Sequence, residues 1–430
     1  MCPRGLPVGR LAALVIAVAA CAPPATREAA AVTASTTAGP PPPQGCDPIS
    51  AAETPWTLYD ADPDHLWNRL SRALLERTAA DGSRHGWRSL DPLLWQETDF
   101  LLEGPPQRQA LDLLDELLAG DLAVAEPVLR ALLQRDLWAV FDWTTIDPES
   151  RPEARLALQR RLAQAIRRLA LSEEEVRALP DNFDATIRSG AFAAGPQEDP
   201  TTPYIPPGLA SATDGWLLLG QDGGPIAMTH TESFPFLGRS VFLVLVRRAP
   251  AGEVTAEFVE QLNYERGSRT LAALDLTGLE VALVRRAVLI DDHGRMVLSP
   301  LVESVQLRRF SPAQHFFQFE LDRVALLRND PSLCPVEAEI PLFATHGDPF
   351  QSGFRAQAPI PELCRGCHGD MVSGVSSVLS YSRFRFELAA GETPVLTPTS
   401  VEAETRAVLE WKRSHRSWLL LESLMGWREP

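Results

Sequence analysis

The residues best suited to chemistry are five consecutive ones, Cys364-Arg365-Gly366-Cys367-His368. Their spacing reads C-x-x-C-H, which is typical of covalent haem attachment. The two thiols can add to the two vinyl groups of a haem, because the two-residue spacer sets the sulfurs at the required separation. His368 then lies beneath the iron as an axial ligand. Gly366 has no Cβ to obstruct the porphyrin in a tight turn.

These five residues resemble the haem-binding motif of c-type cytochromes. The resemblance implies a covalent haem c with its iron, Cys364 and Cys367 as the thioether residues, and His368 as an iron ligand. It also implies one-electron transfer, with the potential set by the second axial ligand, by burial and by hydrogen bonds. We identify no family resemblance in the rest of the chain.

Other sites also use a C-x-x-C spacing, namely a dithiol redox pair, a structural disulfide or half of a zinc site. A redox pair is expected at a strand-to-helix junction, whereas this motif follows Ala358-Pro359-Ile360-Pro361, which favours a loop. A zinc site needs a second pair of ligands, and the sequence has no other C-x-x-C and no H-x3-H. Haem attachment is therefore the favoured interpretation, and the others stay open.

A second axial ligand would be a methionine or histidine that reaches the face of the iron opposite His368. Met371 is too near in sequence to cross the edge of the ring, and His346 lies upstream in an expected loop. Met425 and His415 share the apolar stripe of one expected C-terminal helix. We expect this helix to supply the ligand, with Met425 ranked above His415. The alternative for His415 is an imidazole that borders the stripe and reaches water.

The first residues of the chain predict export and a lipid anchor. Residues 1–20 combine Arg4 and Arg10 with the run LAALVIAVAA, which is too short to span a bilayer and is typical of a signal peptide. Val18-Ala19-Ala20-Cys21 resembles the lipobox of bacterial lipoproteins, in which the cysteine is lipidated; a secretory peptide cleaved elsewhere is the alternative. Residues 21–55 are rich in Ala, Thr and Pro and are expected to be a disordered tether. The body is therefore expected outside the cytoplasm, at the periplasmic or cell-surface face of a bacterial membrane.

The chain is acidic, with a formal net charge of −16 that becomes −18 when Arg4 and Arg10 leave with the signal peptide. It has no basic stripe, so nucleic acid is not an expected partner. An acidic body favours cationic partners, so we expect a redox protein more basic than this chain. Lys412 is the only lysine among the 40 basic residues, a bias that composition explains without a functional role.

Residues 56–190 predict a helical domain. Capping boxes at Ser150 with Glu153 and at Ser172 with Glu175 predict two helix starts. The tryptophans and leucines of this region are expected to pack in a core. Apolar residues recur at helical spacing in four stretches: 64–77, 107–118, 127–143 and 154–170.

Residues 191–328 predict a β-rich α+β domain that begins with a Pro/Gly/Thr-rich connector at 191–212. A helix is expected over 255–262. Asp291-Asp292-His293-Gly294 is expected to be the turn of a hairpin, with a metal site at the two aspartates as the alternative. The second strand of this hairpin is expected from Met296 onward. The other expected strands cover 216–219, 226–229, 240–247, 280–290, 302–310 and 315–327.

Residues 329–430 are expected to form a small haem c module that ends in an amphipathic helix over 402–425. Helices that precede strands along the chain predict an α+β class with segregated domains, so the fold expected is a multidomain α+β protein. Its parts are an N-terminal helical domain, a middle β-rich domain and the C-terminal haem module.

The six cysteines divide by expected role. Four are accounted for by the signal peptide, the lipid and the haem: Cys2, Cys21, Cys364 and Cys367. Cys46 and Cys334 remain, and in an oxidising compartment they are expected to form a disulfide. The competing pairing joins Cys334 to Cys364, which would remove one haem thioether.

The favoured hypothesis is a membrane-anchored, extracytoplasmic monohaem c protein that transfers one electron at a time, an electron carrier rather than an enzyme. A second hypothesis is a non-redox binding or scaffold lipoprotein, with a structural haem or an unoccupied C-x-x-C-H. A third is a haem enzyme resembling peroxidases, which needs an open iron face with an acid-base group nearby. No P-loop, nucleophile elbow or metalloprotease motif is present.

Overall fold

The computed structural model describes residues 57–78, 84–85, 99–120, 126–193, 202–232, 236–248, 254–268, 276–310, 314–335 and 395–426. All of these belong to one compact unit, Pro42–Pro430. The expected signal peptide, Cys21, the tether, Cys46, His346 and the C-x-x-C-H motif lie outside the described residues. No helix in the described part of the chain is both long enough and apolar enough to cross a membrane.

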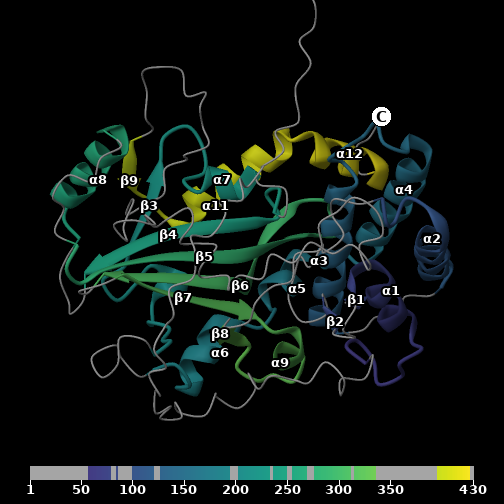
Figure 1. Ribbon diagram of the computed structural model, residues 1–430, viewed down its shortest axis with the longest axis horizontal. Helices are drawn as coiled ribbons and strands as arrows, with labels where there is room; N and C mark the ends of the chain where they lie inside the picture. The colour runs from purple at the N-terminus through teal and green to yellow at the C-terminus, as the bar shows by residue number, and fades with distance from the viewer. Residues whose placement is uncertain are drawn as a thin grey trace, which may run out of the picture. The chain divides into compact units, whose positions relative to one another are not determined.

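The fold is mixed α+β and is organised on one seven-stranded antiparallel sheet (Figure 1). The strand order is β8-β7-β6-β5-β4-β3-β9, so six strands follow one another as a meander and the last strand joins the opposite edge. The strands are β3 (Leu217–Gln221), β4 (Ser240–Arg248), β5 (Leu279–Ile290), β6 (Met296–Phe310), β7 (Gln314–Leu321), β8 (Leu333–Pro335) and β9 (Leu396–Pro398).

Strand β4 shows why the sheet is covered on both faces. Successive side chains of a strand point to opposite faces, and here both sets are apolar. Val241, Leu243 and Leu245 belong to the main hydrophobic core with the helices. Phe242 and Val244 pack on the other face beside α7 (Met228–Glu232), within a second cluster. A continuous apolar run therefore marks a strand buried on both sides.

Helices surround this sheet, and most of them precede it in the chain. The main core joins residues of α1 to α6, α9, α11 and α12 with residues of the sheet. The helical residues before 190 and the strands after 216 therefore share one continuous core. Besides α7, the helices in the described residues are α1 (Leu66–Leu75), α2 (Gly104–Ala119), α3 (Pro127–Trp143), α4 (Pro152–Arg168), α5 (Glu173–Arg177), α6 (Asn182–Ser189), α8 (Ala256–Ser268), α9 (Arg323–Leu327), α11 (Val401–Ser414) and α12 (Arg416–Met425). Two short elements, β1 (Arg77–Thr78) and β2 (Arg84–His85), form a separate two-stranded pair, and η1 is a 3-10 turn at Leu209–Ser211.

Of the two predicted capping boxes, one is present in the structure and the other is not. The capping box of Ser172 and Glu175 is confirmed, because each side chain bonds the backbone N–H of the other residue at the start of α5. The predicted box of Ser150 and Glu153 is wrong. Helix α4 begins at Pro152, and the Ser150 hydroxyl bonds the carboxylate of Asp99 instead.

Two predicted strands are also corrected. Residues 226–229 lead into helix α7 and pair with no strand. The strand expected over 315–327 ends at Leu321, because the Asp322 carboxylate accepts hydrogen bonds from the N–H groups of Val324 and Ala325 and so caps α9. The hairpin turn at Asp291–Gly294 is confirmed between β5 and β6.

The helix expected over 402–425 is two helices. Its continuity breaks at His415, whose backbone is extended at φ −78° and ψ 140° and which ends α11 and begins α12. The apolar stripe continues across the break, because Val408, Trp418 and Leu421 are all buried in the main core. The periodic pattern therefore predicted the buried face correctly but did not indicate the break between the two helices.

Candidate functional site

The C-x-x-C-H motif belongs, by its place in the sequence, to the connection between the two edges of the sheet. The chain leaves the described residues after Pro335 on edge strand β8 and re-enters at Val395 before β9, which pairs with β3 on the opposite edge. The two edges are six strand spacings apart, about 29 Å at the usual spacing. The connection that carries Cys364 to His368 is thus joined to the sheet at both of its ends.

Helices α11 and α12 follow β9 (Figure 1). The two predicted iron ligands are His415, between these helices, and Met425, the last residue of α12. Helix α11 packs along β4, and α12 packs on α4. Gly238, just before β4, allows the close approach of α11, since a Cβ there would stand 2.9 Å from the ring of Trp411. Its φ of +70° also favours glycine.

His415 is positioned by three contacts. Its Nδ1 lies 2.9 Å from the Ser417 hydroxyl and accepts from the Ser417 N–H at 3.3 Å, which caps α12. Its ring stacks on Trp411, with centroids 5.1 Å apart and an interplanar angle of 23°. Burial, and secondly the nearby Lys412, lower its pKa, so the imidazole is neutral at pH 7. Its Nε2 makes no hydrogen bond within the described residues.

Met425 has a different environment. It is only 2% exposed and belongs to the main core at the last turn of α12. Its carbonyl accepts a hydrogen bond of 2.7 Å from Arg167 of α4, which fixes the end of the helix against the body. At about 1.5 Å per residue, His415 and Met425 stand about 15 Å apart along the helix, so the structure does not bring these two predicted ligands together.

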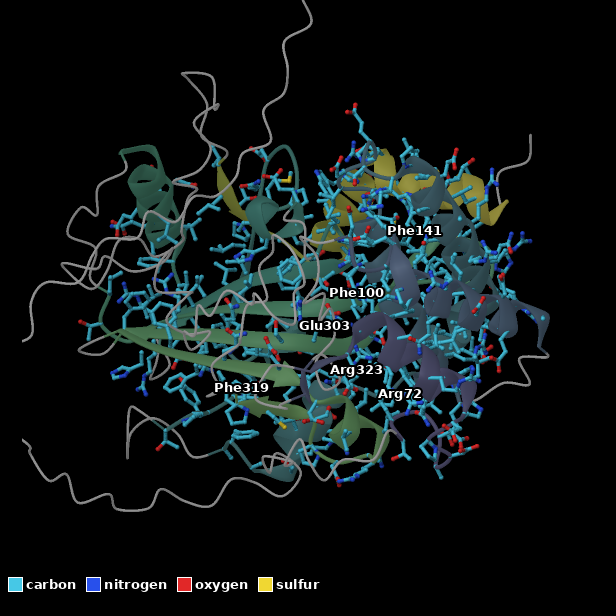
Figure 2. The ribbon with its side chains drawn as sticks, turned by 45° about the vertical axis from the view of Figure 1, so that its right-hand side comes forward. Arg72, Phe100, Phe141, Glu303, Phe319 and Arg323 are labelled. Atoms are coloured by element: carbon cyan, nitrogen blue, oxygen red, sulfur yellow. The ribbon has the colours of Figure 1, made fainter. Side chains whose placement is uncertain are left out.

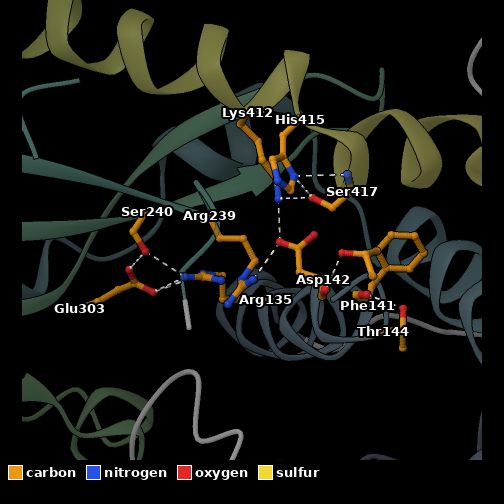
Figure 3. A network of polar contacts seen from close by, with 11 residues as sticks. Arg135, Phe141, Asp142, Thr144, Arg239, Ser240, Glu303, Lys412, His415 and Ser417 are labelled. Atoms are coloured by element: carbon orange, nitrogen blue, oxygen red, sulfur yellow. Dashed lines mark hydrogen bonds and ion pairs between the residues drawn. The ribbon is translucent and has the colours of Figure 1, made fainter. Parts of the chain in front are cut away.

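Beneath His415 lies a buried cluster of charges that the sequence analysis did not identify (Figure 3). Lys412 of α11 donates to Oδ2 of Asp142 on α3 at 2.7 Å, and Arg239 donates to the same oxygen at 2.8 Å. The side chains of all three residues are 0% exposed. The Lys412 ammonium also donates to Ser417 at 3.0 Å, which links this cluster to the cap of α12.

The pKa values of the pair follow from burial and charge. Burial alone would raise the pKa of Asp142, but the two cations Lys412 and Arg239 outweigh it and lower the pKa below its ordinary value. Burial lowers the pKa of Lys412 to about 8, although Asp142 opposes the shift. Both groups are charged at pH 7, and they form a buried ion pair between the C-terminal helices and α3.

A second part of the cluster connects α3 to the sheet. Arg135 of α3 donates to the Glu303 carboxylate of β6 at 2.9 Å and to the Ser240 hydroxyl of β4 at 2.9 Å. Figure 2 shows Glu303 and Arg323 among the side chains between the sheet and the helices. Arg323 pairs in the same region with Asp136 of α3 through a bond of 2.6 Å.

Helix α11 buries one more ionisable group on the same side as Lys412. Glu404, eight residues earlier, is 3% exposed and accepts a hydrogen bond of 2.8 Å from the N–H of Ile226. Burial raises the pKa of Glu404 to about 7, with the bond from Ile226 opposing the shift. Helix α11 is therefore held to the body by an acid near one end and a base near the other.

The aspartates of the β5–β6 turn are explained by structure. Asp291, Asp292 and His293 lie close enough together to hold a metal ion. Asp291 is fully buried, however, and its carboxylate accepts from the N–H groups of His293 and Arg295 and from the Arg295 side chain at 2.8 Å. These bonds occupy the only buried member of the group, as the turn interpretation predicts.

The charged residues of α3 carry a signal in the sequence that could have indicated the cluster. In the run LLQRDLWAVFDW the residues Arg135, Asp136 and Asp142 interrupt a helix that is apolar on every side. Such a helix is buried all round, and buried charges need partners. The pattern could have located the cluster on α3, although not the partner on α11.

Comparison with known proteins found no matching family model, no similar curated protein and no similar solved structure.

Proposed function

We propose that this chain is a membrane-anchored, extracytoplasmic c-type haem protein that transfers single electrons. The observation that carries the proposal is the C-x-x-C-H motif of Cys364, Cys367 and His368 in a chain that begins with a signal peptide and lipobox pattern. Export matters because haem c is attached outside the cytoplasm in the cytochromes that the motif resembles. A bound haem would supply the redox centre, and the protein would tune it through ligands and burial.

The arrangement around the motif supports this proposal in one respect. The connection that carries Cys364 to His368 is joined to an edge strand at each end, β8 on one side and β9 on the other. A redox centre in this connection would therefore lie within the chain, between two strands of the sheet, and not in a terminal segment. The body, with its buried ion pairs, would then serve as the platform that presents the centre to a partner.

The geometry favours His415 over Met425 as the second axial ligand, which reverses the ranking expected from the sequence. The Nδ1 of His415 is occupied by Ser417, and its Nε2 makes no hydrogen bond within the described residues. An iron-binding histidine uses one ring nitrogen while its other nitrogen is fixed by a hydrogen bond, and it must be neutral. Met425 would have to leave the core to reach a metal.

The partner proposed for this chain is a cationic redox protein. The net charge of −16 attracts a positively charged partner and repels anionic ones, and this steering weakens as salt concentration rises. A lipid on Cys21 with the tether of residues 21–55 would keep the body close to the membrane while it reaches that partner.

The experiment that tests the proposal is a pyridine haemochrome spectrum of the full chain, purified from a bacterial host with the haem c attachment machinery. The expected result is a c-type spectrum with one haem per chain and visible bands that sharpen on reduction. The Cys364→Ala/Cys367→Ala double variant, made in the same host, is the matched control and should lack covalent haem. Protein that folds and carries no covalent haem would overturn the proposal.

A scaffold lipoprotein is the second candidate, since the residues from α1 to α9 form an extensive body that a small electron carrier does not need. Redox cycling separates the two functions. A carrier should reoxidise reversibly with a six-coordinate ferrous iron, whereas a structural haem should show no reversible electron exchange with a cationic protein acceptor.

A further inference from the structure

A cavity of about 340 Å³ lies at the end of strand β4, and its described lining residues include none from α11 or α12. Its walls come from α6, from the residues that follow it and from the segment that precedes η1. They are mainly apolar, with Phe192, Ile205, Pro206 and Pro207 among the lining residues. Two large polar side chains, Tyr204 and Arg247, also line the cavity. This volume is at the lower end of the range found for small-molecule sites.

The sheet places a row of charged residues beside this cavity. Arg247 of β4 is opposite Glu280 of β5, and Glu280 is opposite Arg309 of β6. Residues directly opposite on neighbouring strands share a face, so all three side chains stand on the face that α6 covers. Two guanidinium groups therefore flank one carboxylate, which leaves the row with one excess positive charge.

Two contacts fix the Arg247 side chain at the wall of the cavity. Its Nε donates to Glu280 at 2.6 Å, and its guanidinium lies over the ring of Trp216 at 4.5 Å. The side chain is 17% exposed, and its two Nη groups donate no hydrogen bond within the described part of the chain. The side chain is thus rigid, mostly desolvated and still able to donate at the cavity wall.

Glu280 cannot neutralise the whole row. It is 0% exposed and is already bonded by Arg247 and by the Tyr204 hydroxyl. Arg309 lies 3.8 Å from Glu280 and is 12% exposed, and its buried Nε and Nη1 donate no hydrogen bond within the described residues. Burial, and secondly Glu280, raise the pKa of Tyr204, so the phenol stays protonated and adds no negative charge. A buried cation without full compensation favours a nearby anion.

We infer that this cavity binds a small organic anion, a carboxylate with an apolar aromatic or aliphatic body. The carboxylate would accept hydrogen bonds from the Nη groups of Arg247, since a planar guanidinium matches the geometry of a carboxylate. The apolar body would contact Phe192, Ile205 and the prolines Pro206 and Pro207. This site is independent of the haem proposal, because it lies on residues that the motif does not include.

The test is isothermal titration calorimetry of the full chain with 3-phenylpropionate, and with 3-phenylpropanol as the uncharged match. Binding of the acid at one site per chain is expected, with a much weaker response to the alcohol. Arg247→Gln should weaken binding of the acid by at least about tenfold, because the substitution removes a charge-assisted hydrogen bond. Arg248→Gln is the matched control. Arg248 is the next residue of β4, on the opposite face, and lies over Phe258 at 4.8 Å.

A second variant keeps the test decisive if Arg247→Gln disturbs Glu280. Ala193 lines the cavity at an exposed position, so Ala193→Phe should fill the space without touching the charged row. It should abolish binding of the acid while leaving the thermal unfolding temperature unchanged. The inference is overturned if the wild-type chain shows no saturable binding of the acid up to about 10 mM, if acid and alcohol bind equally, or if Ala193→Phe binds as the wild type does.

Discussion

The Nζ of Lys412 lies 2.7 Å from Oδ2 of Asp142, and neither side chain is exposed. The other 39 basic residues of the chain are arginines, and its single lysine stands at a fully buried position. Asp142 already accepts from Arg239, and the ring of Trp138 lies 5.4 Å from the Nζ. A compact ammonium fits this space, whereas a planar guanidinium needs more room. The pair joins the C-terminal helices to α3.

Replacing Lys412 by methionine should destabilise the protein by about 3–5 kcal/mol, because the buried Asp142 carboxylate loses one of its two cations. The free energy of unfolding in urea measures the effect. Lys412→Arg should also destabilise, through overpacking against Trp138. Arg188→Gln, which breaks the exposed pair with Asp184, is the control and should change stability by less than about 1 kcal/mol.

A double variant distinguishes the ion pair from simple packing. Lys412→Met with Asp142→Asn removes both charges, so it should cost less than the sum of the two single variants. If the double variant is destabilised by the sum of the two single variants, the two charges do not interact, and the ion pair does not contribute to stability.

Glu404 should make the stability depend on pH near neutrality. Its pKa is about 7 in the folded protein against an ordinary value of 4.5, so the folded state holds the proton more tightly than the unfolded chain. The stabilisation is complete below pH 4.5 and is lost as the pH rises through 7. Glu404→Gln keeps an acceptor for the Ile226 N–H and never ionises. It should differ from the wild type by less than about 1 kcal/mol at pH 5 and exceed it by about 2–3 kcal/mol at pH 8.

Urea titrations at several pH values between 5 and 8 measure this difference. Glu402, on the exposed side of the same helix, provides the control, and Glu402→Gln should show no comparable increase in stability over this range. A wild-type to Glu404→Gln difference that is constant from pH 5 to pH 8 would contradict the assignment of a buried, proton-binding carboxyl.

Local patterns predicted much of the fold. The apolar run at residues 240–247 gave strand β4, and Asp291–Gly294 gave the β5–β6 turn. Ser172 with Glu175 gave the start of α5, since a capping box is complete within four residues. The sequence missed the break at His415, because the apolar stripe keeps its period across one extended residue.

The candidate site was less predictable, because its contacts join residues far apart in the chain. Asp142 and Lys412 are separated by 270 positions, and no local pattern couples them. The C-x-x-C-H motif was found since its chemistry depends on five adjacent residues. The charged row of Arg247, Glu280 and Arg309 required the register of three strands, which the sequence alone does not fix.

The disulfide prediction can be checked directly. Cys334 of β8 is disulfide-bonded, and the expected partner Cys46 lies outside the described residues. Peptide mapping without reduction should recover Cys46 and Cys334 in one linked fragment. This bond would connect the end of the tether to an edge of the sheet. A Cys334–Cys364 fragment would contradict both this pairing and the attachment of haem through two thioethers.

The last prediction concerns the second axial ligand of the proposed haem. His415→Asn should change the ferric spectrum and the reduction potential, because it removes the ring nitrogen that would bind iron. Asparagine is a good N-cap, so the start of α12 should persist. Met425→Leu should instead preserve the spectrum and potential while lowering stability by less than about 1.5 kcal/mol, since the two side chains have similar volumes. Absorption and circular dichroism spectra with a redox titration measure both variants. A ferric spectrum that changes in Met425→Leu and not in His415→Asn would assign the ligand to the methionine, and a higher potential in the wild type would agree with that outcome.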